Sequence, residues 1–548
     1  MSRFTLTVGV RQLITKLILK GYRIYKVFEL NPNPKLNLII GNNESGKSTL
    51  LEAISLALTG RVNGKWASEE LNPYWFNVET VRDFIKTRES GVKAKFPEIS
   101  IELFFEGSDD LQILCGAHNT DIPTNACPGI TFKVVPNTEE FNDELEQWVD
   151  SNSGSEILPT DYYKTEWTPF HGRSITRRPK ELATVNIDSR TVRSTSGVDY
   201  HLNQILNEHL DVSERVAISE KFRRIKATMT HDSFSDVNSR IERLNACLHD
   251  KPISLAMDQS SRTKWEGSVT PHVAGLPFSV SGQGQQASIK ISLAMSKHSE
   301  RARFVTIEEP ENHLSHTSLT TLLSRLQTLA GEQQQIFIST HSSYVLNRLG
   351  LNSLLLLGGS DVYRIPELNP ETVSYFKKLP GYDTLRLVLA SKIVLVEGPS
   401  DEIIFERVFR DRYGKMPMEF GVDVLSMRGI SLRKCLELCS CLDKTVAALR
   451  DNDGLDPADL INDLLQWLES GKRELFIGDP KDGRSLESQI LACNGENVIR
   501  SVLGVTDRAD LSKWMTREKT EAAIRIAEST DQITPPDYIA KAVEFIHD

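Results

Sequence analysis

The chain has 548 residues, of which 39% are hydrophobic and 25% charged, so it is long enough for about two to four globular domains. No apolar stretch reaches the length of a membrane span, and the N-terminus lacks the pattern of a signal peptide. The formal net charge of −10 argues against a broad nucleic-acid-binding surface, although a local basic groove can still act at short range. The seven cysteines are scattered and fit no zinc pattern, so we expect a protein of the reducing cytoplasm. Because no apolar stretch is long enough to span a membrane, we expect no membrane contact.

A phosphate-binding loop follows the first clear strand of the sequence. The apolar run 35–40 predicts a strand and 49–58 predicts a helix, with the pattern G-x-x-x-x-G-K-S between them. In this pattern the N–H groups of the loop and of the helix N-terminus cradle phosphates. Lys47 is expected to reach the β- and γ-phosphates, and Ser48 to ligate Mg²⁺. The residues expected to contact ATP are Gly41, Asn42, Asn43, Glu44, Ser45, Gly46, Lys47, Ser48 and Thr49.

A polar region from about 115 to 270 interrupts the ATPase pattern. Loops rich in Pro, Ser and Asn are expected at 119–160, and a helical stretch at roughly 199–249. The residues alone leave open a plain pair of helices packed on their own ATPase domain.

Three later segments indicate which kind of ATPase this is. The segment 281–286, with Ser281, Gly282 and Gly284, resembles the signature of ABC-type ATPases, which binds the γ-phosphate held by the opposite protomer. The run 304–307 predicts a strand that ends on two acidic residues, and 336–340 predicts a strand that ends on a histidine. Signature, acidic strand and histidine follow one another in the order typical of ABC-type ATPases.

Roles for the three strand-end residues follow from that resemblance. Glu308 is expected to hold the Mg²⁺ water, Glu309 to polarise the attacking water, and His341 to act as the switch histidine. Most ABC-type ATPases have Asp where Glu308 stands.

The last third of the chain has two short apolar runs that end on carboxylates. The run 393–396 leads to Glu397 and Asp401, and the run ending at 450 leads to Asp451 and Asp453. Such runs are typical of buried parallel strands, and chemistry gathers at the carboxyl ends of strands in open α/β sheets. We therefore expect the four carboxylates to meet at one edge and hold Mg²⁺, which prefers oxygen ligands.

These two motifs resemble the TOPRIM domain of topoisomerases, primases and a class of nucleases. In that domain a Glu-Gly pair follows the first strand, as in Glu397-Gly398, and an Asp-x-Asp follows a later strand.

An ABC-type ATPase followed by a TOPRIM domain resembles the OLD (overcoming lysogenization defect) family of ATP-dependent nucleases. Further family-like segments are Leu17–Arg23, Glu308–Leu314, Val396–Asp401, Ser485–Glu487 and Lys519–Ala523.

The resemblance implies a nuclease centre with two Mg²⁺ or Mn²⁺ ions. The implied ligands are Glu397, Asp401, Asp451, Asp453 and Glu487, and Lys519 would stabilise charge on the scissile phosphate. It also implies DNA as substrate, a helical dimerisation insertion, a homodimer or higher oligomer, and a role in antiphage defence. A helicase-like subunit, or a retron reverse transcriptase with its DNA and RNA, is a possible partner.

The expected fold class is α/β, with an ABC-type P-loop ATPase domain over residues 1–365 and a TOPRIM nuclease domain over 385–548. The function expected first is an ATP-regulated, metal-dependent DNA endonuclease. An ATP-gated DNA-binding protein of the SMC or RecF kind, with a TOPRIM domain that does not cleave, is the alternative, and a topoisomerase or primase is a third. Whether ATP activates or restrains cleavage stays open.

Overall fold

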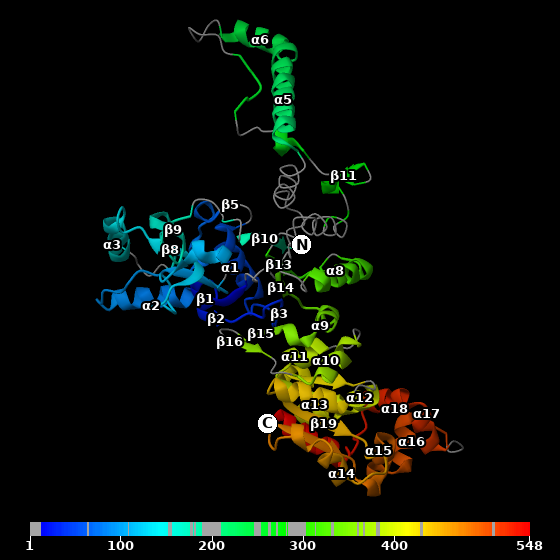
Figure 1. Cartoon of the computed structure of the whole chain (residues 1–548). Coiled ribbons are helices and arrows are strands. Elements are labelled where there is room, and N and C mark those ends of the chain that lie inside the picture. The colour runs from blue at the N-terminus through cyan, green and yellow to red at the C-terminus, as the bar shows by residue number, and fades with distance from the viewer. Residues whose placement is uncertain are drawn as a thin grey trace, which may run out of the picture. The chain divides into compact units, whose positions relative to one another are not determined.

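The computed structural model of the chain describes residues 13–62, 65–107, 109–151, 156–175, 179, 182–188, 210–245, 254–260, 265–269, 272–273, 275–280, 282, 286, 303–312, 314–329, 334–358, 361–364, 368–379, 384–427, 431–506 and 510–548. These residues fall into two compact units, one of Met1–Asn37 with Gly46–Thr340 and the other of Leu38–Ser45 with His341–Asp548 (Figure 1). No helix in the described part of the chain combines the length and apolar character that crossing a membrane requires.

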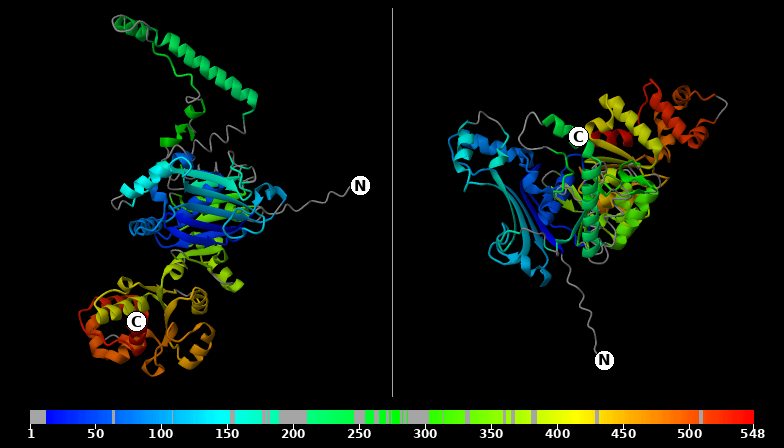
Figure 2. Two further views of the ribbon diagram at one scale, coloured as in Figure 1. Left: turned by 90° about the vertical axis from the view of Figure 1, so that its left-hand side faces the viewer. Right: turned by 90° about the horizontal axis from the view of Figure 1, so that it is seen from above.

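An antiparallel sheet forms one layer of the first unit. Its strands lie in the order β2-β1-β6-β8-β7, and β9 also pairs with β8 (blue to cyan in Figure 2). The strands are β1 (Ile14–Tyr22), β2 (Tyr25–Leu30), β6 (Ile99–Phe105), β7 (Cys115–Gly116), β8 (Cys127–Pro136) and β9 (Tyr163–Pro169).

A parallel group of strands forms a second layer of the first unit. Strand β13 (Phe304–Glu308) lies between β10 (Thr184–Asp188) and β14 (Gln335–Ser339) and pairs in parallel with both. Helix α1 (Lys47–Thr59) packs against β6 and β8 of the antiparallel sheet and against all three parallel strands. Because α1 has apolar neighbours on both sides, it is buried along most of its length, and it ends at Gly60 in the left-handed conformation.

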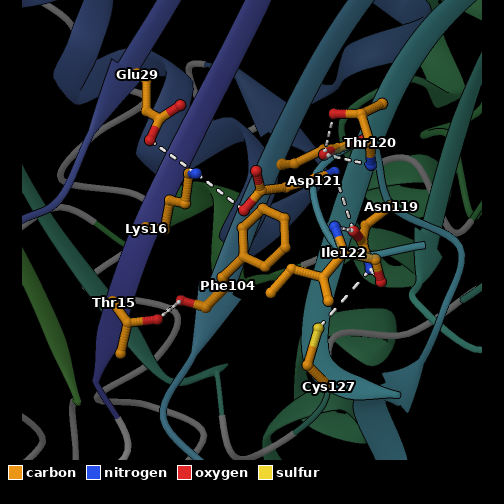
Figure 3. A network of polar contacts seen from close by, with 10 residues as sticks. Thr15, Lys16, Glu29, Phe104, Asn119, Thr120, Asp121, Ile122 and Cys127 are labelled. Atoms are coloured by element: carbon orange, nitrogen blue, oxygen red, sulfur yellow. Dashed lines mark hydrogen bonds and ion pairs between the residues drawn. The ribbon is translucent and has the colours of Figure 1, made fainter. Parts of the chain in front are cut away.

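A polar network holds the loop before β8 against the antiparallel sheet (Figure 3). Lys16 Nζ of β1 lies 2.7 Å from a Glu29 carboxylate oxygen and 2.8 Å from an Asp121 carboxylate oxygen. The Thr120 hydroxyl donates to Glu102 Oε2 at 2.8 Å, and the Asn119 side-chain amide donates to Cys127 Sγ at 3.7 Å. These contacts hold residues 119–121 of the loop against the strands.

The region expected as a helical insertion from about residue 115 starts differently in the structure. Residues 127–136 and 163–169 are strands β8 and β9 of the same sheet as β1, so this part belongs to the ATPase fold. The described helices of the region are α5 (Val212–Asp232) and α6 (Ser235–Asn245). The helical pattern at 201–209 lies outside the described residues.

The remaining elements of the first unit are short or peripheral. They are β4 (Arg61–Val62), β5 (Lys65–Trp66), α2 (Val78–Glu89), α3 (Asn142–Ser151), β11 (His272–Val273), β12 (Leu276–Pro277) and α8 (His316–Leu329).

Strand β3 (Leu36–Gly41) begins in the first unit and continues in the second. In the first unit, the Lys35 carbonyl before it accepts a hydrogen bond from Ile336 N–H of β14 at 2.7 Å. In the second unit, Leu38–Gly41 pair in parallel with β15 (Leu354–Gly358), which pairs with β16 (Asp361–Arg364). Three helices belong to this part of the second unit: α9 (Ser343–Leu349), α10 (Pro370–Lys377) and α11 (Thr384–Leu389).

A four-stranded parallel sheet is the centre of the C-terminal part of the second unit (yellow to red in Figure 1). Its strands lie in the order β18-β17-β19-β20, as β18 (Val422–Ser426), β17 (Lys392–Val396), β19 (Thr445–Arg450) and β20 (Arg473–Ile477). The two central strands are almost wholly buried, as expected for apolar runs in a parallel sheet.

Helices cover this sheet. Helix α12 packs on β17 and β18, α19 packs on β17, β19 and β20, and the two helices contact each other. The helices are α12 (Pro399–Tyr413), α13 (Leu432–Cys441), α14 (Pro457–Asn462), α15 (Leu486–Asn494), α16 (Glu496–Leu503), α17 (Leu511–Arg517), α18 (Lys519–Glu528) and α19 (Asp537–His547). Cys435 and Cys439 of α13 are buried.

Candidate functional site

The ends of β17 and β19 bring together the two acidic motifs of the C-terminal sheet. Glu397 directly follows β17 and Asp451 directly follows β19, and these strands are parallel neighbours. The Asp451 N–H donates to Glu397 Oε1 at 3.3 Å. The sheet topology therefore places the two predicted carboxylates side by side.

Asp401 joins this edge from the first turn of α12. The Gly398 N–H donates to Asp401 Oδ2 at 3.0 Å, so the carboxylate caps the helix start that follows β17. Pro399 at the first helical position fits this tight strand-to-helix connection.

Asp453 stands on a turn that Asn452 organises. The buried Asn452 amide donates to the carbonyls of Gly478 and Gly483, at 3.0 and 2.7 Å, and its Oδ1 accepts from the Gly454 N–H at 2.8 Å. Asp453 has φ 52°, a conformation that costs energy for a residue with a side chain. Asn452 is a site residue that the sequence reasoning missed, because it occupies the variable position of Asp-x-Asp.

Glu487 and Lys519 lie close to each other. Lys519 Nζ is 3.4 Å from Glu487 Oε1, with the lysine half exposed and the glutamate buried. The Ser485 hydroxyl donates to Glu487 Oε2 at 2.7 Å. Both residues lie at helix N-termini: Glu487 is in the first turn of α15, and Lys519 is the first residue of α18.

The carboxylates repel one another in a partly dehydrated setting. Burial, and then the charges of Asp401, Glu397 and Glu487, raise the pKa of Asp451 to about 7, while Lys519 opposes the shift. Burial and the Asp401 charge raise the pKa of Glu397, and burial raises the pKa of Asp401. Bound cations would relieve this repulsion.

The geometry is that of an acidic edge and not of a closed metal cage. In the ranges that the structure describes, no three His, Cys, Asp or Glu side chains are arranged to hold a metal ion together. Mg²⁺ usually keeps several waters and takes one or two carboxylates together with substrate phosphates. The donor set at this edge fits that manner of binding.

The phosphate loop of the first unit is built around Gly46. Gly46 has φ 93°, and a Cβ atom there would lie 2.3 Å from the Tyr25 hydroxyl. That hydroxyl donates to the Gly46 carbonyl at 3.2 Å, so the loop backbone sits directly on a buried tyrosine. Only glycine fits this conformation at this close approach.

The two residues after Gly46 face the acidic strand end of β13. The Ser48 hydroxyl donates to the Glu308 carboxylate, which is buried at the end of that strand. Burial lowers the pKa of Lys47, while the charges of Glu309 and Glu308 oppose the shift. Thr49 is buried in the first turn of α1.

Glu309 is held in an unusual backbone conformation. Its φ is 45°, its N–H donates to the Ser339 carbonyl at 2.9 Å, and the Asn312 amide donates to its Oε2 at 2.6 Å. Such strain is typical of functional positions. The sequence reasoning did not single out Asn312.

The other predicted ATP residues differ in backbone conformation, hydrogen bonding and exposure. In the second unit, Gly41 ends β3, the Ser45 N–H donates to the Asn42 carbonyl at 3.2 Å, Glu44 has φ 65° and His341 is exposed. Asn43 lies in the same turn. Of the signature, Gly282 accepts a hydrogen bond from Gln286 N–H at 3.0 Å, whereas Ser281 and Gly284 lie outside the described residues.

Two sequence profiles match parts of the chain. Residues 16–251 match the profile described as an AAA domain. Residues 388–453 match the profile described as the TOPRIM domain of proteins like the overcoming lysogenization defect protein. The second range contains Glu397, Asp401, Asp451 and Asp453, and ends before Glu487 and Lys519.

A curated relative and several solved structures resemble segments of the chain. Endonuclease GajA of Bacillus cereus (strain VD045) is 28% identical over 142 residues, which are 24% of each chain, so the match spans about a quarter of that relative's length. The C-terminal region of the Burkholderia pseudomallei OLD protein is 19% identical, with 29% of this chain and 97% of that chain covered and a TM-score of 0.25. The recombination mediator RecF bound to ATP is 12% identical over 66% of this chain and 100% of its own, with a TM-score of 0.33. At such TM-scores the structural likeness carries no argument.

Proposed function

We propose that this chain, in which an AAA domain precedes an OLD-like TOPRIM domain, is an ATP-regulated, metal-dependent DNA endonuclease of the OLD family. The observation that supports it best is the edge formed by the ends of β17 and β19, where the Asp451 N–H donates to Glu397 and where burial, and then the surrounding carboxylates, raise the pKa of Asp451 to about 7. Carboxylates that are partly buried at one strand edge repel one another, and bound cations would offset that repulsion.

Each cation would take one or two carboxylates together with waters and substrate phosphates, and the proposed ligands are Glu397, Asp401, Asp451, Asp453 and Glu487. Bound there, one or two Mg²⁺ or Mn²⁺ ions would lower the pKa of a water and stabilise the leaving oxygen of a phosphodiester. Lys519, which lies beside Glu487 and is half exposed, would offset negative charge on the scissile phosphate. The Gly398 N–H and the Ser485 hydroxyl orient Asp401 and Glu487 in the absence of substrate.

The residues around the phosphate loop would bind and hydrolyse ATP. Lys47 and the Gly46 loop would hold the phosphates, and the Ser48–Glu308 pair would hold the nucleotide's Mg²⁺. Glu309, oriented by Asn312, is the proposed group that polarises the attacking water. The signature residues Ser281, Gly282 and Gly284 and the histidine His341 would complete the ATP site. Because an ABC-type signature binds the γ-phosphate held by the opposite protomer, the proposal includes a homodimer.

Cleavage of a supercoiled plasmid tests the proposal. Purified full-length protein should nick or linearise the plasmid in Mg²⁺ or Mn²⁺, and Asp451→Asn should lower the rate by about 10²-fold or more because a shared ligand loses its charge. Asp459→Asn is a matched control, since Asp459 is an exposed aspartate on α14 of the same domain.

Three other results would change the assignment. DNA binding without cleavage in either metal would favour the ATP-gated DNA-binding alternative, and relaxed closed circles would indicate a topoisomerase. Parent-level cleavage by Asp451→Asn would contradict the proposed centre. A cytoplasmic antiphage role with a helicase-like or retron partner follows from the family alone and needs infection assays with the neighbouring genes.

A further inference from the structure

An arginine of the loop between β20 and α15 lies on the turn that carries Asp453. A Cβ atom placed on Gly454 would lie 3.0 Å from Arg484 Nε and 3.2 Å from Arg484 Cζ, so the guanidinium lies against this glycine. The Asp453 N–H donates to the Arg484 carbonyl at 3.3 Å. Both the main chain and the side chain of Arg484 therefore lie beside the Asp-x-Asp motif at the end of β19.

Two buried amides hold this loop in place. The Asn452 amide donates to the carbonyls of Gly478 and Gly483. The Gln489 amide of α15, on a side chain that is 3% exposed, donates to the carbonyls of Asp479 and Gly483 at 2.6 and 2.8 Å. Because these bonds fix the residue directly before Arg484, the arginine is positioned before any ligand binds, which lowers the entropy cost of binding.

Arg484 differs from the other cations of this region in its pairing. Lys481 of the same loop lies 4.0 Å from Asp479, and Lys519 lies 3.4 Å from Glu487. Arg484 is exposed, and no carboxylate of the residues that the structure describes lies within ion-pair distance of its guanidinium. The donors of Arg484 are therefore open to a ligand from solvent.

The chemistry of the region indicates which ligand this is. A guanidinium suits a phosphate because its planar fork donates two parallel hydrogen bonds to two phosphate oxygens. DNA carries a negative charge at every phosphate, so the proposed carboxylate ligands repel it until nearby cations offset their charge. An arginine fixed next to Asp453 supplies such a positive charge.

We propose that Arg484 binds a backbone phosphate of the DNA next to the scissile phosphate, and so holds the strand at the acidic edge. The inference rests on the proposed function for the identity of the site, but it concerns DNA binding by the protein itself. Lys519 is the proposed contact of the scissile phosphate and would act in the transition state. Arg484 would instead hold substrate and transition state equally, and such uniform binding lowers KM without raising kcat.

Arg484→Gln in the full-length protein tests the inference. Binding of a fluorescent DNA duplex is measured by anisotropy in Ca²⁺ over a range of salt concentrations, with the duplex checked on a gel, and plasmid cleavage is measured against plasmid concentration in Mn²⁺. We expect DNA affinity to fall about 10-fold at low salt, and the slope of log affinity against log salt to become shallower by about 0.9, the value for one phosphate contact. KM should rise by a similar factor while kcat stays within about twofold of the parent value.

Three further variants separate the contact from net charge and from packing. Arg412→Gln removes the same charge from the last turn of α12, where Arg412 pairs with Glu544, and should bind DNA like the parent. Arg484→Lys should keep the salt dependence and restore part of the affinity, since it keeps the charge and loses the fork. Arg484→Met keeps an apolar stem against Gly454 and should bind DNA as weakly as Arg484→Gln.

Four results would overturn the inference. They are parent-level DNA affinity in Arg484→Gln, a fall in its kcat with no change in KM, an equal loss of affinity in Arg412→Gln, and recovery of parent-level binding by Arg484→Met.

The outcomes for the two proposals differ. A parent protein that binds DNA through Arg484 but cuts none would contradict the proposed function and support the inference. A parent protein that cuts plasmid, with an unchanged KM in Arg484→Gln, would overturn the inference alone. A parent protein that binds no DNA would overturn both.

Discussion

A single buried amide shapes the proposed centre at the scale of one residue. Asn452 is 1% exposed, yet it lies between two carboxylates that must reach solvent to meet a cation. Two of its hydrogen bonds connect the turn after β19 to the carbonyls of Gly478 and Gly483, in the segment that leads into α15 and Glu487, and the third closes the turn at Gly454. The same side chain therefore sets the direction of Asp453 and the spacing to Glu487.

We predict that Asn452→Ala lowers both stability and cleavage. The carbonyls of Gly478 and Gly483 would lose their donor, and leaving buried groups unpaired costs about 1–3 kcal/mol. Thermal melting should show this loss, and cleavage should fall more than the change in folded fraction explains. Asn462→Ala, on the exposed end of α14, is the control and should melt like the parent. Parent-level cleavage by Asn452→Ala would mean that the turn tolerates movement.

Lys519→Ala should lower the cleavage rate by about 10²–10³-fold, the scale of losing one charge contact in the transition state. Mn²⁺ and ATP binding should change little, because the lysine contacts Glu487 as a cation and ligates nothing itself. Lys519→Arg should restore only part of the rate, since a planar fork does not replace a point ammonium. Lys513→Ala, at a surface ion pair with Asp510, is the control. If Lys519→Ala cuts plasmid at the parent rate, Lys519 is only the surface partner of Glu487.

At the scale of elements, the joint between the phosphate loop and α1 depends on the close approach of Gly46 to Tyr25. Gly46→Ala should destabilise the protein and abolish nucleotide binding, because the left-handed conformation costs about 1–2 kcal/mol for alanine and the new Cβ meets the Tyr25 hydroxyl. The buried Tyr25 ring packs 4.3 Å from Phe28 and cannot easily retreat.

Gly91→Ala is the matched control for that prediction. Gly91 also has a positive φ, of 79°, but a Cβ atom there has open space around it. Melting temperatures of the two variants separate the strain from the overlap, and binding of a fluorescent ATP analogue reports the loop. Equal effects of the two substitutions would contradict the close approach at Gly46.

Local patterns made parts of this fold predictable and left other parts hidden. The ends of β17 and β19 could be predicted because each strand is one uninterrupted apolar run, and parallel neighbours end at the same edge. The strands β8 and β9 were hidden within the expected insertion, because their pairing with β6 and with each other joins segments far apart in sequence.

At the scale of the whole molecule, the order of domains is what the sequence predicted. The α/β fold class is confirmed by an AAA profile over residues 16–251 followed by an OLD-like TOPRIM profile over residues 388–453. The residue roles, the dimer and the effect of ATP on cleavage remain predictions.

ATP is predicted to join two copies of the chain. In ABC-type ATPases the signature of one protomer binds the γ-phosphate held by the other, so bound ATP adds contacts that exist only in a dimer. Glu309→Gln should bind ATP but hydrolyse it much more slowly, because the amide cannot polarise the attacking water. With ATP and Mg²⁺, light scattering should therefore show a larger and longer-lived dimer fraction for Glu309→Gln than for the parent. Lys47→Ala is the control that binds nucleotide weakly and should give no ATP-dependent gain. Only monomer at micromolar concentration, with ATP and in the Glu309→Gln variant, would contradict an ATP site shared between protomers.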